Sequence, residues 1–280
     1  MSEQIDEIEL AKTELGKKAV YDFHYNPKKL FPVTRAGRRA EIGIHEKLPF
    51  FGYDLWNHYE VSWLNEKGKP IVGIAEVVYG CDTPCLIESK SMKLYFNSFN
   101  NTPFNDVKAV EAALTKDLTE KTGAPVEVNV TTVNAFKEEK VVRGFSGTNL
   151  DELDIACTVY MVDPSLLKTE GEVVEETLCS DLLKSNCLVT GQPDWGSIQI
   201  TYKGKKINHE SLLRYIVSFR DHTEFGEHCI ERIFMNLLNY CKPEELTIYI
   251  SYTRRGGLDI NFARSTKPVK REKQSRICRQ

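Results

Sequence analysis

A cysteine and an aspartate stand on either side of one turn in the second half of the chain. Cys187 precedes the run 190–193 (Thr-Gly-Gln-Pro), and Asp194 directly follows it. A turn of this length folds the acid back toward the sulfur. A thiolate is a nucleophile, and a nearby carboxyl group moves the proton that such a reaction requires. Taken alone, the pattern is more often that of a small buried cysteine.

A polar and basic string runs from Ile87 to Tyr95 and reads Ile-Glu-Ser-Lys-Ser-Met-Lys-Leu-Tyr. Hydroxyl groups such as that of Ser89 and ammonium groups such as that of Lys90 are suited to hold phosphates. The carboxylate of Glu88 is suited to accept hydrogen bonds from a ring N–H and an amine. The same string is equally typical of a surface loop that leads into a helix.

Two arginines, Arg254 and Arg255, precede the pair Gly256-Gly257 between two apolar runs. The glycine pair predicts a hairpin turn, which explains it structurally. Adjacent arginines at a turn are also suited to a bidentate grip on a phosphate, such as a ribose 2′-phosphate.

The segment Phe225-Gly226-Glu227 begins a predicted helix. An acid in the first turn suits the helix dipole, and Glu227 could also bind the same kind of group as Glu88. The chain has neither a dinucleotide-binding glycine motif nor a P-loop. Cys81 and Cys85 lack a second Cys/His pair at zinc spacing, so the sequence predicts no metal site.

The elements that position these residues follow from the apolar periodicity. Val110, Leu114 and Leu118 recur at helical spacing, for example, and Gly123 and Pro125 end that pattern. We predict helices over 5–17, 105–121, 209–219 and 225–240, and strands over 58–64, 70–79, 126–133, 155–162, 195–202, 246–252 and 258–262, with a hairpin turn over 65–68.

The second half repeats the element order of the first. The string 95–99 (Tyr-Phe-Asn-Ser-Phe) is echoed by 215–219 (Tyr-Ile-Val-Ser-Phe), and each precedes a long helix and a strand. This favours two related α+β halves. We predict an N-terminal arm over 1–45, extended at 25–32, a first module over 46–150, an acidic linker and crossover over 151–183, a second module over 184–265, and a solvated basic tail over 266–280.

The composition is that of a globular enzyme or binding protein. Of 280 residues, 41% are hydrophobic and 28% charged, and the net charge is −3, which argues against a chain that coats nucleic acid. The acidic N-terminus does not resemble a signal peptide, and the apolar runs are too short to span a membrane. We therefore expect a cytoplasmic protein whose eight cysteines are free thiols.

Taken together and in this order, these segments resemble the long, two-module form of the NADPH-dependent 7-cyano-7-deazaguanine reductase family, which belongs to the queuosine pathway of tRNA modification. The string at 88–95 and the Cys-to-Asp spacing at 187–194 are the most specific motifs, and the resemblance covers nearly the whole chain. It implies two tandem tunnelling-fold modules, each an antiparallel sheet with helices on one face. It also implies a homo-oligomer, expected to be a dimer, with no direct contact to nucleic acid.

The resemblance also implies roles for individual residues. Cys187 adds to the nitrile carbon and forms a covalent thioimide, while Asp194 donates the proton. Two molecules of NADPH each supply one hydride. The implied substrate contacts are Ile87, Glu88, Ser89, Phe225, Gly226 and Glu227, and the implied NADPH contacts are Ser89, Lys90, Arg254, Arg255 and Gly256.

The chain departs from the family pattern at two positions. Gly226 stands where histidine is usual, and His228 lies about 200° further around a helix, too far to replace it. We therefore expect adduct formation to survive and reduction to be slowed. Phe262 stands where proline is more usual, and we attach no functional claim to it.

Three further expectations accompany this interpretation. The resemblance implies a reversible disulfide between Cys187 and Cys229 that protects the nucleophile. A different tunnelling-fold enzyme acting on pterins or purines is one alternative, although the zinc-dependent ones need ligand spacings that this chain lacks. A purine-binding protein that has lost catalysis through Gly226 is the other alternative.

Overall fold

The structure is a computed structural model that describes residues 21–137, 140–188, 190–271 and 275–280. It divides into two compact units. Unit 1 comprises the described residues of Met1–Ala40, Asp54–Glu138 and Arg254–Asp259, and unit 2 those of Glu41–Tyr53, Glu139–Thr253 and Ile260–Gln280. The helix predicted over 5–17 lies outside the described residues.

The sheet of unit 1 begins with the predicted hairpin. Its strands are β2 (Phe51–Leu64), β3 (Pro70–Gly80) and β5 (Val126–Thr132), in the order β5-β3-β2. Gly68 has a φ of +76°, and its N–H donates to the Asn65 carbonyl at 2.9 Å, which closes the predicted turn. Glycine adopts this left-handed conformation at no steric cost.

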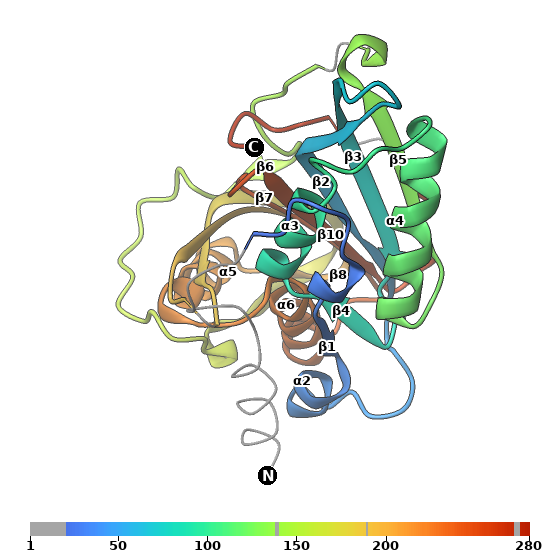
Figure 1. Cartoon of the computed structure of the whole chain (residues 1–280). Helices are drawn as coiled ribbons and strands as arrows, with labels where there is room; N and C mark the ends of the chain where they lie inside the picture. Colours follow the sequence, from blue (N-terminus) through green and yellow to red (C-terminus); the bar gives the residue numbers. More distant parts are fainter. Residues whose placement is uncertain (1–20, 138–139, 189, 272–274) are drawn as a thin grey trace. The chain divides into compact units, whose positions relative to one another are not determined.

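The long helix of unit 1 is α4 (Val107–Thr122), as the apolar spacing predicts. Asp106 caps its N-terminus by accepting a hydrogen bond from the Ala109 N–H, and Gly123 ends it in a left-handed conformation. The helix packs along β5, where the Glu111 carboxylate accepts from the Val130 N–H at 2.8 Å (Figure 1).

A shorter helix, α3 (Ser89–Asn97), precedes α4 and follows β4 (Cys85–Ile87). The other short elements of unit 1 are η1 (Pro27–Lys29), β1 (Pro32–Thr34), α2 (Ala36–Glu41), whose last residue falls in unit 2, and η2 (Val133–Ala135). The arm predicted to be extended over 25–32 therefore contains a helical turn. This is because the Asn26 side chain accepts from the Lys28 N–H and a proline follows, which together begin a short helix.

Unit 2 repeats the order of hairpin, short helix, long helix and strand. Its strands are β6 (Thr148–Asn149), β7 (Thr169–Asn186), β8 (Pro193–Ile207), β9 (Glu245–Tyr252) and β10 (Leu258–Ser265), in the order β10-β9-β8-β7-β6. Its helices are η3 (Pro164–Leu166), α5 (His209–Val217), η4 (Ser218–Asp221) and α6 (Gly226–Cys241). The strand pairs β7–β8, β8–β9 and β9–β10 are antiparallel, whereas β6 pairs with β7 in parallel.

The predicted α+β fold with mainly antiparallel sheets is confirmed. The lengths of the helices also match between the units, because α3 and α5 have nine residues each and α4 and α6 have sixteen. Each module therefore carries the same pair of helices. Among the described residues, no helix has both the length and the apolar character needed to cross a membrane.

Two predictions about the middle of the chain are wrong. Residues 155–162 form no strand, because Tyr160 and Met161 are exposed and the Tyr160 carbonyl instead accepts from the Asp221 N–H at 2.8 Å. The eighteen-residue strand β7 occupies much of the predicted linker. Its acidic first half is mostly exposed, so its composition resembles that of a linker, whereas most of its second half is buried or half-buried.

The described end of the predicted solvated tail is packed against unit 2. Ile277 is only 2% exposed, and the Val142 N–H donates to the Arg276 carbonyl at 2.9 Å. The Gln280 side chain donates to Asn261 on β10 at 2.6 Å. Ile277 is an apolar residue in a segment that is otherwise rich in Lys and Arg, so the overall composition gave no indication of this packing.

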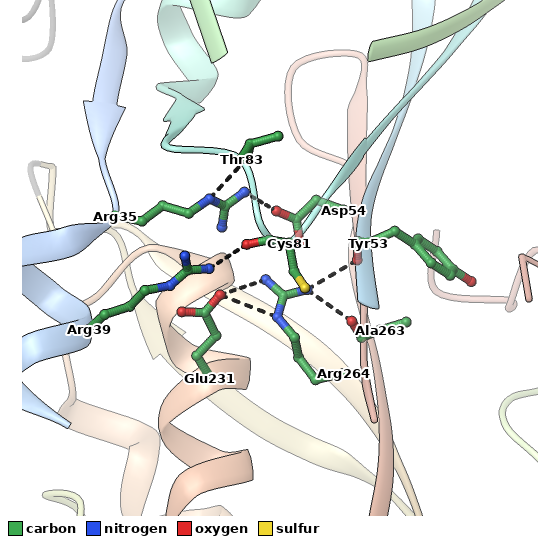
Figure 2. A network of polar contacts seen from close by, with 9 residues as sticks. All are labelled: Arg35, Arg39, Tyr53, Asp54, Cys81, Thr83, Glu231, Ala263 and Arg264. Atoms are coloured by element: carbon green, nitrogen blue, oxygen red, sulfur yellow. Dashed lines mark hydrogen bonds and ion pairs between the residues drawn. The ribbon is translucent and has the colours of Figure 1, made fainter. Parts of the chain in front are cut away.

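Each unit also buries an ion pair. In unit 1, Arg35 pairs with Asp54, and both side chains are essentially inaccessible to solvent (Figure 2). In unit 2, Arg264 pairs with Glu231 and donates to the Tyr53 and Ala263 carbonyls (Figure 2). Removing one partner of such a pair leaves a buried charge and costs about 3–5 kcal/mol.

Candidate functional site

Cys187 lies directly after β7, at the entry of the turn that leads to β8. Its N–H donates to the Gln192 carbonyl at 2.8 Å, and its own carbonyl accepts from the Gly191 N–H at 3.0 Å. Gly191 has a φ of +64°, a conformation that glycine supplies readily. The predicted turn is therefore present, and its backbone hydrogen bonds fix the position of Cys187.

Asp194 lies on the same face of this hairpin as Cys187. Asp194 is paired with Ser185, and Pro193 is paired with Asn186. The hydrogen bond from Cys187 to Gln192 continues this register by one position. Side chains two positions apart on a strand share a face, so Cys187 and Asp194 are diagonal neighbours, with Cα atoms about 7–8 Å apart. The hairpin thus carries a thiol and an acid on one face.

A buried polar cluster lies on this face of unit 2. The hydroxyls of Ser185 and Tyr252 are 3.5 Å apart, and both interact with the Cys229 thiol. Cys229 is fully buried, and burial raises the pKa of its thiol to about 12. Cys187 is 7% exposed. Both cysteines are buried, and Cys187 keeps the larger exposed fraction. Both are free thiols, and the disulfide between them stays a prediction.

The start of α6 carries the predicted substrate residues of unit 2. Phe225 is the N-cap, Gly226 the first helical residue and Glu227 the second. Glu227 is only 3% exposed, although an acid that served the helix dipole alone could remain in solvent. A buried carboxylate in a first helical turn is suited to receive the N–H groups of a ligand.

Gly226 has no room for a side chain. A Cβ built on it would lie 2.7 Å from Phe262 Cε2 and 3.1 Å from Tyr252 Cε2. Phe262 is 1% exposed and packs edge-on against Tyr252, with ring centroids 6.0 Å apart. The two departures from the family pattern are therefore in contact, because the ring of Phe262 fills the space that a residue at 226 would need.

Glu88, in unit 1, is the N-cap of α3. Its carboxylate accepts from the N–H groups of Lys90 and Ser91, at 2.7 Å each, and from the Ser89 hydroxyl at 3.4 Å. Glu88 is 1% exposed, and burial raises the pKa of its carboxyl although these hydrogen bonds oppose the shift. The surface-loop interpretation of this string is wrong, because the string itself forms the helix. Ile87, which ends β4, is also buried.

The predicted cofactor residues gather at one end of unit 1. Ser89 and Lys90 are half-buried in the first turn of α3, whereas Arg254, Arg255 and Gly256 are exposed. Gly256 has a φ of +59°, and a Cβ there would lie 2.7 Å from Nζ of Lys93 on α3. The glycine therefore allows the 254–257 turn to approach this helix closely.

Two more side chains of this region are Lys93, the second lysine of the 87–95 string, and Tyr59, which was not singled out from the sequence. Lys93 is 38% exposed and lies 3.7 Å from the Glu60 carboxylate. Its spacing of three residues from Lys90 places both ammonium groups on neighbouring helical positions. The guanidinium of Arg254 stacks over the Tyr59 ring at 3.4 Å from its centroid, which occupies one face of this arginine.

The predicted site residues thus fall into two groups. The structure brings Cys187 and Asp194 to one face of the β7–β8 hairpin, and Phe225, Gly226 and Glu227 to the start of α6, all in unit 2. Ile87, Glu88, Ser89 and Lys90, with Arg254, Arg255 and Gly256, belong to unit 1. Within the described ranges, no group of three or more His, Cys, Asp or Glu side chains is placed to hold a metal ion.

Comparison with known proteins gives matches over most of the chain. Residues 21–130 match the family described as "Nitrile reductase, 7-cyano-7-deazaguanine-reductase N-term", and residues 193–271 match "QueF-like protein". A protein of Legionella pneumophila (strain Lens) is 56% identical over 271 residues, 96% of this chain and 95% of its own. One of Acidovorax ebreus (strain TPSY) is 52% identical over 276 residues, 96% of this chain and 98% of its own. Both are named NADPH-dependent 7-cyano-7-deazaguanine reductase.

A solved structure titled "Crystal structure of the archaeosine synthase QueF-Like in the apo form" matches with a TM-score of 0.29 and 13% identity, over 36% of this chain and 99% of its own. A TM-score this low does not establish a shared fold. The identity to the two reductases, above 50% over 96% of this chain, does establish the family. The chain belongs to the NADPH-dependent 7-cyano-7-deazaguanine reductase family.

Proposed function

We propose that this protein reduces the nitrile of 7-cyano-7-deazaguanine to the aminomethyl group, with NADPH, in queuosine biosynthesis. The names of relatives that are more than half identical over the whole chain support this reaction. The observation in the molecule that carries it is the hairpin that presents Cys187 and Asp194 on one face. A thiol and an acid in this relation are what covalent addition to a nitrile requires.

In the first step the sulfur of Cys187 forms a bond to the nitrile carbon, and one bond of the carbon–nitrogen triple bond becomes an N–H bond. Asp194 supplies this proton or relays it from the thiol, so the addition involves no change of oxidation state. The resulting thioimide accepts a hydride more readily than a nitrile does, because its carbon is more electrophilic. After the first hydride has been added, the nitrogen takes a proton, and its lone pair then expels the sulfur as a thiolate and leaves an imine. A second hydride and a further proton give the amine, and Asp194, on the same face, moves these protons.

The two buried carboxylates serve as acceptors for the substrate. In unit 1, Glu88 accepts hydrogen bonds from N–H groups of the deazaguanine, with Ile87 and Ser89 beside it in the sequence. In unit 2, Glu227 has the same role, with Phe225 and Gly226 directly before it. The raised pKa of Glu88 reflects a carboxylate that burial has partly deprived of water. Ligand N–H donors favour its charged form, so substrate binding lowers this pKa.

NADPH, when bound, supplies the hydrides, one from each of two molecules. The exposed end of unit 1 fits its phosphates, since Ser89, Lys90, Arg254 and Arg255 offer hydroxyl, ammonium and guanidinium donors. Gly256 adds a backbone that a ligand can approach closely. These residues bind and orient the cofactor, while Cys187 holds the group to be reduced.

We further propose that the protein acts in the cytoplasm as a homodimer and has no direct contact with nucleic acid. The net charge of −3 supports the last point, since proteins that bind nucleic acid are usually basic. The oligomeric state is measurable by light scattering coupled to size-exclusion chromatography.

The decisive experiment is an intact-mass spectrum after mixing the protein with 7-cyano-7-deazaguanine in the absence of NADPH. We expect a gain of one ligand mass, which peptide mapping places on Cys187. Cys187→Ala should show no gain, and Asp194→Asn should gain mass more slowly. If the folded, reduced wild-type protein binds the ligand but gains no mass, it is a purine-binding protein and not a nitrile reductase.

A further inference from the structure

The segment His222–Glu224 lies beside the residue that precedes Cys187. The Asn186 N–H donates to the His222 carbonyl at 2.8 Å, and the Glu224 N–H donates to the Asn186 carbonyl at 3.1 Å. These bonds form a parallel β-bridge between Asn186 and Thr223. The backbone immediately before Cys187 is therefore held by a segment that is distant in the sequence.

The Asn186 side chain strengthens this connection. Its Nδ2 donates to the carbonyls of Arg220 and His222 at 3.3 and 3.2 Å, and its Oδ1 accepts from Lys184 Nζ at 2.7 Å. Both backbone groups and both side-chain ends of Asn186 thus have partners. Together with the hydrogen bonds of Cys187 within its own turn, they leave the sulfur little freedom to move.

An ion pair fixes the other side of the segment to α6. Arg232 donates from Nε and Nη2 to the two carboxylate oxygens of Glu224, at 2.9 and 2.8 Å. His222 Nε2 lies 2.9 Å from the same carboxylate. Glu224 is 3% exposed. Burial alone would raise its pKa, but the hydrogen bonds from Arg232 and His222 lower it to about 2. The pair is charged and closed at neutral pH.

The same segment leads directly into the start of α6. Glu224 precedes Phe225, the N-cap, and Glu227 lies in the first turn. One short segment is therefore joined by hydrogen bonds to the strand that carries the thiol and by a covalent bond to the helix that carries an acid. Its position decides how the thiol and the helix start are placed relative to each other.

We propose that Glu224 and Arg232 are positioning residues for Cys187, because their bidentate pair holds the segment that ties the thiol strand to the start of α6. This inference rests on the proposed function in assigning a reaction to Cys187. This connection from Asn186 through the segment 222–224 to Arg232, called the tie below, lies within unit 2. Its effect on Cys187 is measurable without the nitrile substrate. A displacement of the order of 1 Å at a reacting atom slows a reaction about 100-fold, so a loosened tie should be visible in the rate.

The test compares Arg232→Ala and Arg232→Lys with the wild-type protein in two reactions of Cys187. The first is adduct formation with 7-cyano-7-deazaguanine, and we expect Arg232→Ala to slow it about 10- to 100-fold. The second is alkylation by iodoacetamide, which needs access to the sulfur but no substrate pocket. We expect Arg232→Ala to accelerate this alkylation several-fold, because the thiol is only 7% exposed in the intact fold. Arg232→Lys keeps the charge but not the two parallel bonds, so intermediate effects are expected.

Rescue and a matched control separate positioning from stability. Guanidinium chloride, added below the concentration that begins to unfold the variant, should raise the rate of adduct formation in Arg232→Ala. It should not raise that rate in the wild-type protein. Tyr202→Phe removes a buried hydroxyl that bonds to Glu176 and to the Ile207 N–H, elsewhere in unit 2. It should lower the melting temperature without changing either reaction of Cys187.

Each outcome decides one question. If Arg232→Ala leaves the alkylation rate of Cys187 unchanged, the positioning role is wrong, whatever its effect on adduct formation with the nitrile substrate. If the wild-type protein forms no adduct while Arg232→Ala still accelerates alkylation, the tie stands and the proposed reaction fails. If Arg232→Ala does not fold, Arg232→Lys carries the test, and an alkylation rate equal to that of the wild-type protein overturns the proposal.

Discussion

In unit 1, two serine hydroxyls of α3 hold the segment that runs before it. Ser91 Oγ accepts from the Phe31 N–H at 3.0 Å, and Ser98 Oγ accepts from the Asn26 N–H at 3.1 Å. Asn26 is also the cap of the short helix η1, which begins at a proline. The segment thus spans the helix from one end to the other.

Unit 2 repeats this arrangement on α5. Ser211 Oγ accepts from the Lys168 N–H at 3.1 Å, and Ser218 Oγ accepts from the Asp163 N–H at 3.4 Å. Asp163 caps η3, which again begins at a proline. The repeated hydrogen bonds extend the five-residue sequence echo into a repeated scaffold, and both segments read Asn or Asp, then Pro, with Leu three residues after the proline.

The units differ at the residue that caps the first helix. Glu88 caps α3 through the N–H groups of Lys90 and Ser91, whereas Asn208 caps α5 through the Ser211 N–H. Both side chains cap their helix by accepting hydrogen bonds from backbone N–H groups, although glutamate is less common than asparagine in that position. Glu88 is buried and Asn208 is half-buried. The fold therefore needs a hydrogen-bond acceptor at the N-cap of this helix, but it does not need the negative charge of Glu88.

The largest expected effect comes from removing each cap in turn. Glu88→Ala should weaken adduct formation with 7-cyano-7-deazaguanine about 100-fold, because two hydrogen bonds to a charged acceptor are lost. Asn208→Ala should cost about 1 kcal/mol of unfolding free energy and leave adduct formation unchanged. Intact mass measures adduct formation, and urea unfolding measures stability. Equal losses of adduct formation in the two variants would show that the charge of Glu88 has no role beyond capping.

The pH dependence of unfolding distinguishes two buried glutamates with opposite shifts. The pKa of Glu224 is lowered to about 2, so its stabilising contribution is present above the usual carboxyl value of 4.5 and is lost as the pH falls toward 2. The contribution is roughly 3 kcal/mol. The pKa of Glu88 is raised by burial, so its charged form opposes folding and that cost grows as the pH rises.

Unfolding measured from pH 6 to pH 2.5 should therefore show a smaller decline in stability for Glu224→Gln than for the wild-type protein. Glu88→Gln serves as the matched control, since it should not reduce this decline. A Glu224→Gln variant whose stability falls as steeply as that of the wild-type protein would contradict the assignment.

The contact between Gly226 and Phe262 predicts coupled substitutions. Gly226→His should destabilise the protein by about 1–3 kcal/mol, because its Cβ would overlap the Phe262 ring. Phe262→Ala opens that space, so the double variant should lose less stability than the sum of the two single variants. Additive losses would show that the two positions are independent.

The double variant also sharpens the expectation that Gly226 slows reduction. Gly226→His alone is a confounded test, since it disturbs packing as well as adding an imidazole. A gain in NADPH oxidation in Gly226→His/Phe262→Ala over Phe262→Ala alone would assign the slow step to the missing imidazole. No gain would remove that expectation.

The smallest effect compares the tyrosines that occupy matching places in the two echo strings. The Tyr95 hydroxyl donates to the Asp117 carboxylate at 2.7 Å, and the Tyr215 hydroxyl accepts from the Asn236 amide at 2.8 Å. Tyr95→Phe should cost about 1.5–3 kcal/mol and Tyr215→Phe about 1 kcal/mol, since the first acceptor is charged. Equal costs in thermal unfolding would mean that the charge of Asp117 adds nothing.

The sequence predicted most elements with clear periodicity and strong end signals. The helix α4 is an example, with a cap at Asp106, apolar residues at helical spacing and a glycine at its end. The short elements β1 and β4 were missed, because three-residue strands carry no periodicity. The helix α3 was also missed, since its cap is a glutamate, which is uncommon in that position.

The turn that joins Cys187 to Asp194 was predictable from the sequence, whereas the contacts that support it were not. Cys187 and Asp194 share a turn, so their proximity follows from spacing. The bridge between Asn186 and Thr223 joins residues far apart in the sequence, and no local pattern encodes it. The overlap of Phe262 with position 226 is equally invisible in the chain, because it depends on the packing of a strand against a helix start.

The shared cap position has an evolutionary consequence. At positions 88 and 208, both glutamate and asparagine supply the acceptor that the helix needs. Replacing one by the other therefore keeps the helix capped, and a lineage can pass between them without losing the fold. In a duplicated gene, one copy can then carry the carboxylate and the other the amide, while Ser91 and Ser211 accept the matching hydrogen bond in both copies.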